Sequence, residues 1–155
     1  GSGATIALRT HGSMVCGSSK TGMTTNSVGT PAQPPEVPID LRMFNGGSRS
    51  VRSFPNRELG PLVDGYPTGG EAGWNTNIEL MRNIWGSLKG VAFVDAGGLA
   101  RNREEWGSAN VELATGLGFR LDLPIGPVRL EYGYNLTRDE GEPSGTLHFA
   151  IGFAY

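Results

Sequence analysis

Apolar and polar residues alternate with a period of two along the second half of the chain. Between residues 110 and 123, each odd position carries an apolar residue or a threonine: Val111, Leu113, Thr115, Leu117, Phe119, Leu121 and Leu123. The even positions are polar, charged or small. This alternation predicts a β-strand with one apolar face. A soluble strand usually has about five or six residues. This run is much longer, and it suits a tilted strand that crosses a membrane.

The same pattern recurs along the rest of the chain. It predicts six consecutive strands of one antiparallel meander, at residues 4–14, 71–82, 88–98, 108–123, 127–136 and 145–155. Between the later strands, a tight turn at residues 124–127 contrasts with longer polar loops at residues 99–106 and 137–144. Short turns at one end and longer loops at the other are typical of an outer-membrane β-barrel.

A soluble β-sandwich is the alternative, since its strands alternate too. The outward face of a sandwich is usually charged, whereas the non-apolar face here consists mostly of Gly, Ala and Asn with a few charges. Aromatic residues at strand ends, namely Trp74, Trp106 and Tyr155, fit the girdles at a membrane interface. The pattern therefore favours the membrane barrel.

Composition removes several classes of function. The net charge of -2 gives no basic field for nucleic acid. The single cysteine, Cys16, allows no internal disulfide framework, and two histidines are too few for a Cys/His zinc site. No Gly-x-Ser-x-Gly elbow occurs, and His11 and His148 lie on strand faces without a matched acid and nucleophile. We therefore expect no enzyme, no cofactor, no metal site and no nucleic-acid partner.

The alternation stops over a long segment, at about residues 15–70. A loop of this length is either disordered or functional. Its centre, residues 41–54, carries arginines, aromatic residues and paired glycines, which indicates ordered packing.

Within this segment, Phe44-Asn45-Gly46-Gly47 followed by Ser50-Val51-Arg52-Ser53-Phe54 resembles the lumen-inserted loop of the bacterial surface antigen family. That family includes the BamA and TamA barrel-assembly proteins and the two-partner secretion transporters. Further segments match it in order, namely Gly69-Gly70-Glu71, Ile78-Glu79-Leu80, Phe93-Val94-Asp95-Ala96-Gly97, Gly126-Pro127-Val128-Arg129-Leu130 and residues 147–155. One departure is Ser53, which stands where the family has a glycine.

The resemblance implies that residues 1–155 form the carboxy-terminal fragment of an outer-membrane β-barrel domain of about sixteen strands. It also implies that the loop at about residues 15–70 is extracellular in origin and inserted into the barrel lumen. In the family, the loop arginine meets acidic residues inside the barrel. The matching positions are Arg52 in the loop motif Val51, Arg52, Ser53 and Phe54, and Glu79 and Asp95 on the wall.

Strand parity places Glu79 and Asp95 on inward faces of adjacent strands. We expect Arg52 to pair with one or both, because a guanidinium can bind two carboxylates in a partly dehydrated lumen. The alternative is that all three are separately solvated. Phe93 and Gly97 belong to the strand motif that the resemblance also covers.

The family implies a function as an assembly factor that folds β-barrel proteins and inserts them into the bacterial outer membrane without a cofactor. The implied partners are nascent outer-membrane proteins, outer-membrane lipids, and periplasmic accessory proteins bound through amino-terminal domains. The last strand carries Phe149, Ile151, Phe153 and Tyr155, which resemble the signal that marks barrel clients. A two-partner secretion transporter and a porin-like structural barrel remain alternatives.

Overall fold

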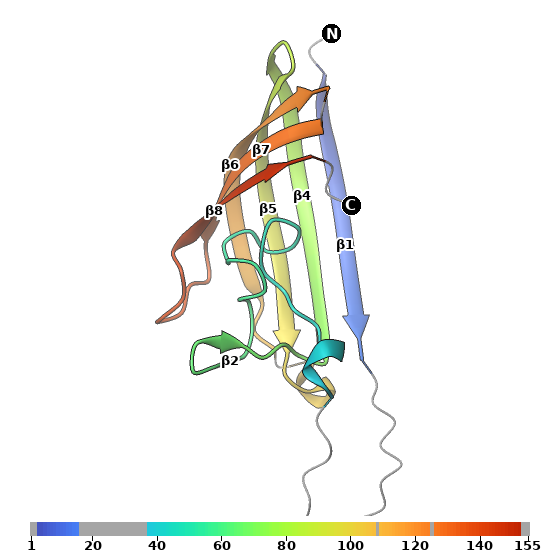
Figure 1. The fold of residues 1–155 in the computed structure, drawn as a ribbon, viewed down its shortest axis with the longest axis vertical. Coiled ribbons are helices and arrows are strands. Elements are labelled where there is room, and N and C mark those ends of the chain that lie inside the picture. The colour runs from blue at the N-terminus through green and yellow to red at the C-terminus, as the bar shows by residue number, and fades with distance from the viewer. Residues whose placement is uncertain (1–2, 16–36, 108, 125, 153–155) are drawn as a thin grey trace, which may run out of the picture.

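One antiparallel sheet of six strands dominates the computed structural model, which describes residues 3–15, 37–107, 109–124 and 126–152 (Figure 1). The spatial order is β1-β4-β5-β6-β7-β8. The strands are β1 (Ala4–Met14), β4 (Ala72–Trp85), β5 (Leu88–Ala100), β6 (Glu112–Leu123), β7 (Gly126–Asn135) and β8 (Gly145–Ile151). The predicted all-β meander of six strands is confirmed.

Some strands begin or end at other residues than predicted, because pairing with the neighbouring strand sets their limits. The predicted strand at residues 108–123 begins only at Glu112, because Gly97 opposite Glu112 is the last residue of β5 that pairs with β6. β4 runs three residues beyond its predicted end at residue 82, since its pairing with β5 continues to Trp85 opposite Leu88. β8 is described as far as Ile151, and residues 153–155 lie outside the described part of the chain.

Short and long connections alternate between the two ends of the sheet. Gly86, with a φ of 55°, and Ser87 join β4 to β5, and a turn of similar length joins β6 to β7. At the opposite end lie residues 101–111, which include the 3-10 helix Arg103–Glu105, and residues 136–144. The long segment between β1 and β4 starts from this same end (Figure 1). This is the predicted asymmetry.

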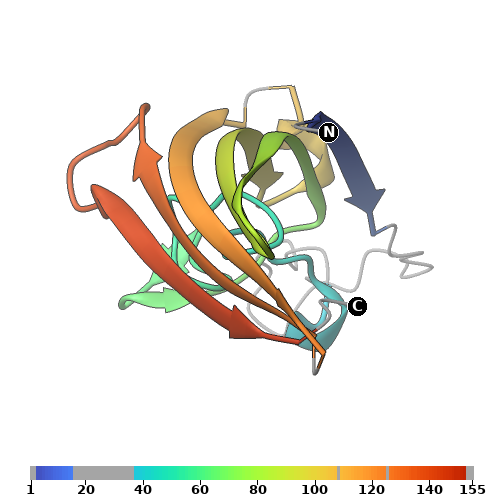
Figure 2. The ribbon, with the colours of Figure 1, turned by 90° about the horizontal axis from the view of Figure 1, so that it is seen from above.

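The sheet is curved (Figure 2), and its two faces differ in chemistry. The convex face carries apolar side chains that are all more than a third exposed, among them Ile6, Leu8, Ile78, Leu80, Val94, Leu117, Phe119, Leu130, Tyr132, Leu147, Phe149 and Ile151. The concave face carries Gly, Asn and charged residues in the alternate positions, several of them buried. No helix in the described part of the chain has the length and apolar character of a membrane-spanning segment.

The described part of the segment between β1 and β4 folds back along the concave face (Figure 2). Its described part, residues 37–71, contains the 3-10 helix Ile39–Leu41 and the small hairpin of β2 (Leu62–Val63) and β3 (Tyr66–Pro67). Single bridges join Met43 to Gly70 and Asn45 to Leu59. The predicted order is therefore present here. The hairpin was not predicted, because two-residue strands leave no alternation to read.

Candidate functional site

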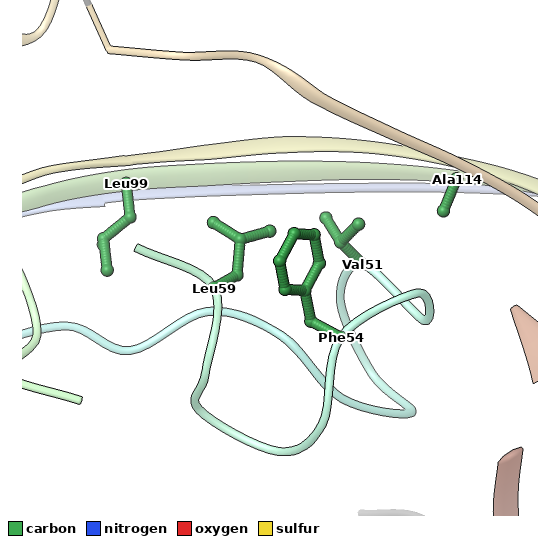
Figure 3. Close-up of a cluster of buried hydrophobic side chains, with 5 residues drawn as sticks. All are labelled: Val51, Phe54, Leu59, Leu99 and Ala114. Atoms are coloured by element: carbon green, nitrogen blue, oxygen red, sulfur yellow. The ribbon is translucent and has the colours of Figure 1, made fainter. Parts of the chain in front are cut away.

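An apolar cluster holds the loop against the wall of the sheet (Figure 3). It consists of Val51, Phe54 and Leu59 from the loop, Leu99 from β5 and Ala114 from β6. Val51 and Phe54 are almost completely buried, so Phe54 packs against the wall of the sheet. The loop comes close because β5 has Gly97 beneath it. A Cβ atom on Gly97 would lie 2.7 Å from Val51 Cγ2.

Arg52 follows Val51 in the loop and forms a bidentate ion pair with Asp95. Its Nε lies 2.8 Å from Asp95 Oδ2, and its Nη2 lies 2.7 Å from Asp95 Oδ1. The Arg52 backbone N–H donates to Asp95 Oδ2 as well, at 3.1 Å. Both side chains are buried. This is the bidentate geometry that gives charge-assisted hydrogen bonds their strength and direction.

The remaining Arg52 nitrogen, Nη1, contacts two more carboxylates. It lies 2.6 Å from Glu79 Oε1 and 3.0 Å from Glu131 Oε2. The structure thus brings Arg52 together with both predicted acidic residues. Glu131 is a third partner that sequence reasoning missed, although its inward position on β7 was readable from parity.

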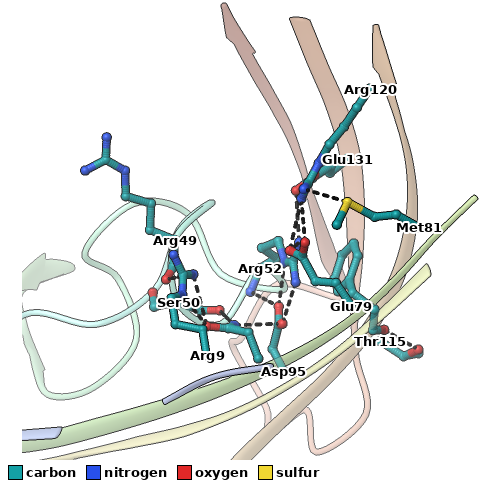
Figure 4. Close-up of polar contacts among 12 residues, drawn as sticks. Arg9, Arg49, Ser50, Arg52, Glu79, Met81, Asp95, Thr115, Arg120 and Glu131 are labelled. Atoms are coloured by element: carbon teal, nitrogen blue, oxygen red, sulfur yellow. Dashed lines mark hydrogen bonds and ion pairs between the residues drawn. The ribbon is translucent and has the colours of Figure 1, made fainter. Parts of the chain in front are cut away.

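A second arginine completes this group. Arg120 of β6 donates to Glu131 Oε1 at 2.7 Å and to Glu79 Oε2 at 2.9 Å. We call Arg52, Glu79, Asp95, Arg120 and Glu131 the Arg52 cluster (Figure 4). It joins the loop to β4, β5, β6 and β7. No sequence signal identified Arg120, whose contact with Glu79 spans β5 and depends on how the sheet curves.

The strand-motif residues Phe93 and Gly97 contact the loop in different ways. Gly97 admits Val51, as described above, while Phe93 lies under Arg52 with its ring centroid 3.5 Å from the guanidinium carbon. Such cation–π stacking adds attraction in a desolvated site. The Phe93 ring in turn occupies the space over Gly116, where a Cβ atom would lie 2.2 Å from Phe93 Cζ.

Asn77 of β4 extends the polar contacts toward β1. Its amide nitrogen lies 2.8 Å from Asp95 Oδ1 and 2.5 Å from the Ser50 carbonyl oxygen. Its amide oxygen accepts a hydrogen bond from Arg9 Nη2 at 3.0 Å. Asn77 is buried, and both the nitrogen and the oxygen of its side-chain amide are hydrogen-bonded. It therefore fixes the position of the Asp95 carboxylate. An inward asparagine is common in this sequence and gave no signal on its own.

The last two strands hold the backbone of Arg52 and Ser53, which we call the loop tip. His148 Nε2 lies 2.9 Å from the Arg52 carbonyl oxygen, and Thr146 Oγ1 donates to the Ser53 carbonyl oxygen at 2.9 Å. Between them, β7 presents Gly133, where a Cβ atom would lie 2.3 Å from the Arg52 oxygen. His148 therefore has a structural contact on the concave face.

Ser53 stands where the family has a glycine, and its backbone conformation is one that any residue can adopt. Among the described non-glycine residues, only Arg57 and Asp64 have a positive φ, so Ser53 does not use a conformation reserved for glycine. Its side chain is fully buried, and its hydroxyl has no hydrogen-bond partner among the described residues.

The electrostatics of the cluster keep Arg52 charged. Burial by itself lowers the pKa of the guanidinium, but the hydrogen bond and charge of Asp95, with the charges of Glu79 and Glu131, raise its pKa above the ordinary arginine value. In the described part of the chain, no three His, Cys, Asp or Glu side chains are grouped to hold a metal ion. The arrangement ties a loop to a wall, and removal of one member would leave a buried charge uncompensated.

The last-strand residues lie away from this site. Phe149 and Ile151 are 64% and 62% exposed on the convex face. Phe153 and Tyr155 lie outside the described residues. Phe149 and Ile151 therefore lie on the face of the sheet opposite the loop motif.

Comparison with known proteins gives one family match over almost the whole chain. Residues 5–155 match the Omp85 superfamily domain. The chain is 31% identical over 118 residues to the outer envelope protein 80, chloroplastic, of Arabidopsis thaliana, and 28% identical over 125 residues to the outer membrane protein assembly factor BamA of Nitratidesulfovibrio vulgaris. These alignments cover 69% and 76% of this chain, but only 14% and 16% of the relatives.

A solved structure shares the fold. It is the crystal structure of BamA from Haemophilus ducreyi lacking POTRA domains 1-3, with a TM-score of 0.62 and 22% sequence identity. The match covers 74% of this chain and 27% of that one. The chain thus spans a small part of the length of each relative.

Proposed function

Because the chain belongs to the Omp85 superfamily, we propose that it is part of an assembly factor that folds β-barrel proteins and inserts them into the outer membrane. The outer membrane is its location, and the described sheet is the carboxy-terminal portion of a barrel like that of BamA. The concave face lines the lumen in this proposal, and the segment at about residues 15–70 is the loop inserted there.

The observation that carries the proposal is the Arg52 cluster. Ion pairs, an apolar anchor and two contacts from β8 all hold one loop against the concave face. These contacts hold the loop and the wall in one arrangement. An assembly factor requires this, because its wall must remain defined while its seam opens to a client strand.

The physical basis of the activity is strand pairing. β1 and β8 are the outermost strands of the sheet, and each has a backbone edge with no partner among the described residues. We propose that β8 forms one side of the seam. A client strand would add to such an edge by β-augmentation, in which main-chain hydrogen bonds supply the affinity. This step requires no catalytic residue and no cofactor.

The proposed partners follow from this mechanism. They are nascent outer-membrane β-barrel proteins at the seam, outer-membrane lipids around the convex face, and periplasmic accessory proteins bound by domains beyond this sequence. The apolar convex face supports the lipid contact. The assignment of clients and accessory proteins rests on the family alone.

The test uses the full-length protein reconstituted in lipid vesicles. A urea-unfolded eight-stranded outer-membrane protein is added, and its folding is followed by protease resistance. We expect faster folding than in empty vesicles, and a clear loss of this effect with Arg52→Ala. Arg138→Ala, in the exposed loop after β7, is the control with the same loss of charge and should retain the activity.

Two other outcomes would change the assignment. Vesicles that do not accelerate barrel folding but take up an unfolded polypeptide would indicate a two-partner secretion transporter. Vesicles that do neither, yet conduct ions, would indicate a porin-like barrel. Either result would refute the assembly function.

A further inference from the structure

A second feature of the concave face lies beside the Arg52 cluster. It is a cavity of about 220 Å³ between the loop and the sheet. Its lining includes four arginines, Arg9 of β1, Arg49 of the loop, Arg120 of β6 and Arg129 of β7, together with Asn77 and Glu79. Figure 4 shows Arg9 and Arg49 on one side of Arg52 and Arg120 on the other.

The arginines of this cavity are poorly neutralised. Glu79 is the acidic side chain of the lining, and it already pairs with Arg52 and Arg120. Arg9 donates to Asn77 Oδ1 and to the Arg49 carbonyl oxygen, which are neutral acceptors. The Arg49 side chain, which is exposed, and the Arg129 side chain, which is half-buried, have no hydrogen-bond or ion-pair partner in the part of the chain that the structure describes.

Arg129 is in the least favourable position. It lies directly opposite Arg120 in the β6–β7 register, and like charges at such positions repel each other. Its Nε is buried and has no hydrogen-bond partner among the described residues. The cavity and the Arg52 cluster together hold five guanidinium groups and three carboxylates, a surplus of two positive charges.

We propose that this cavity binds an oxyanion of the carboxylate or phosphate class. Guanidinium groups recognise such anions through paired N–H donors, and the buried Nε of Arg129 is costly to leave without an acceptor. The volume suffices for one such group with several waters, at about 30 Å³ for each water. The anion is either an acidic side chain from another part of the same protein or a free phosphate-type ion.

Calorimetric titration of the full-length protein in detergent with inorganic phosphate, at low ionic strength, separates the two sources. If the anion is free, the wild type binds phosphate. Arg129→Gln and Arg49→Gln should then each weaken binding about tenfold, which corresponds to the loss of one charge-assisted contact. Arg138→Gln carries the same charge change outside the cavity and should leave binding unchanged.

If a carboxylate of the same protein fills the cavity, phosphate gives no binding heat. In that case Arg129→Gln and Arg49→Gln should lower the melting temperature by several degrees in phosphate-free buffer, and Arg138→Gln should not. The proposal is overturned if phosphate does not bind and Arg129→Gln keeps or raises the melting temperature, since removal of a lone cation opposite Arg120 relieves repulsion. Phosphate binding that neither cavity variant weakens also overturns it.

Discussion

At the scale of single residues, Arg52 is the side chain on which the contacts between loop and sheet converge. Its guanidinium contacts three carboxylates, and its carbonyl oxygen contacts His148. Arg52→Ala in the full-length protein should lower the free energy of unfolding by about 3–5 kcal/mol, because it leaves buried carboxylates without a partner. Urea unfolding in detergent, followed by electrophoretic mobility, measures this. The exposed Arg138→Ala should change it by less than about 1 kcal/mol.

A double-mutant cycle separates pairing from packing. Arg52→Ala combined with Asp95→Ala should cost clearly less than the sum of the two single changes, because the first removal already leaves Asp95 unpaired. The coupling with Asp95 should exceed that with Glu79, which is more exposed and contacts Arg52 through one nitrogen. Additive single effects would contradict the ion pair as the source of stability.

Ser53 tests whether the residue at the loop tip must be the family's glycine. Ser53→Gly removes a buried hydroxyl that has no partner among the described residues, which favours the variant. It also increases the backbone freedom of the unfolded chain, which lowers the stability by about 0.5–1 kcal/mol. The two effects oppose each other, so we expect stability within about 1 kcal/mol of the wild type in the same urea assay. A loss as large as that of Arg52→Ala would show that the serine has a role of its own.

The sequence predicted part of this site and could not predict the rest. Motif and parity were enough to bring Arg52 to Glu79 and Asp95, since those carboxylates lie on neighbouring strands. Glu131 was out of reach because β5 and β6 separate β7 from β4. In a flat sheet, β4 and β7 would lie about 14 Å apart. One guanidinium nitrogen contacts Glu79 and Glu131 together only because the sheet is curved.

At the scale of elements, close approach between loop and strand depends on a glycine in β7. A Cβ atom on Gly133 would lie 2.3 Å from the Arg52 carbonyl oxygen and 2.4 Å from its carbon. Both are backbone atoms, so a rotamer change cannot relieve the clash. Gly133→Ala should therefore displace the loop tip from the wall.

Limited proteolysis of the full-length protein in detergent measures this displacement. We expect cleavage within residues 37–70 to increase several-fold for Gly133→Ala. Gly12→Ala in β1 is the control, because its Cβ atom would meet only Trp74 Cβ at an ordinary 3.9 Å. Equal cleavage of the two variants would mean that the loop tip tolerates the added methyl group and that β7 does not fix its position.

Strand limits show a similar division between local pattern and pairing. Alternation located all six strands, because each has one face that must be apolar. It could not locate the start of β6, where Val111 continues the apolar pattern but lies beyond the last paired position, Glu112. An apolar residue can extend a pattern past the end of a ladder, since hydrogen bonding requires a partner strand and the pattern does not.

At the scale of the whole molecule, the two faces of the sheet require different surroundings. Large apolar side chains cover the convex face, with Leu117 at 70% and Phe149 at 64% exposed. Exposed apolar area of this extent is unusual for a soluble monomer. The concave face, by contrast, carries charged groups, and those of the Arg52 cluster pair with one another across the loop and the sheet.

These features predict how the isolated 155-residue chain behaves in water. We expect it to aggregate, or to associate through the edges of β1 and β8, because both its convex face and its edges lack partners among the described residues. Sedimentation velocity with and without detergent tests this. Detergent should disperse species held together by the convex face, because micelles cover apolar area. Association through the strand edges should persist, because micelles do not pair them. A monodisperse monomer in detergent-free buffer would contradict a lipid-facing role for the convex face, because a chain that hides those side chains in water must fold differently from the sheet described here.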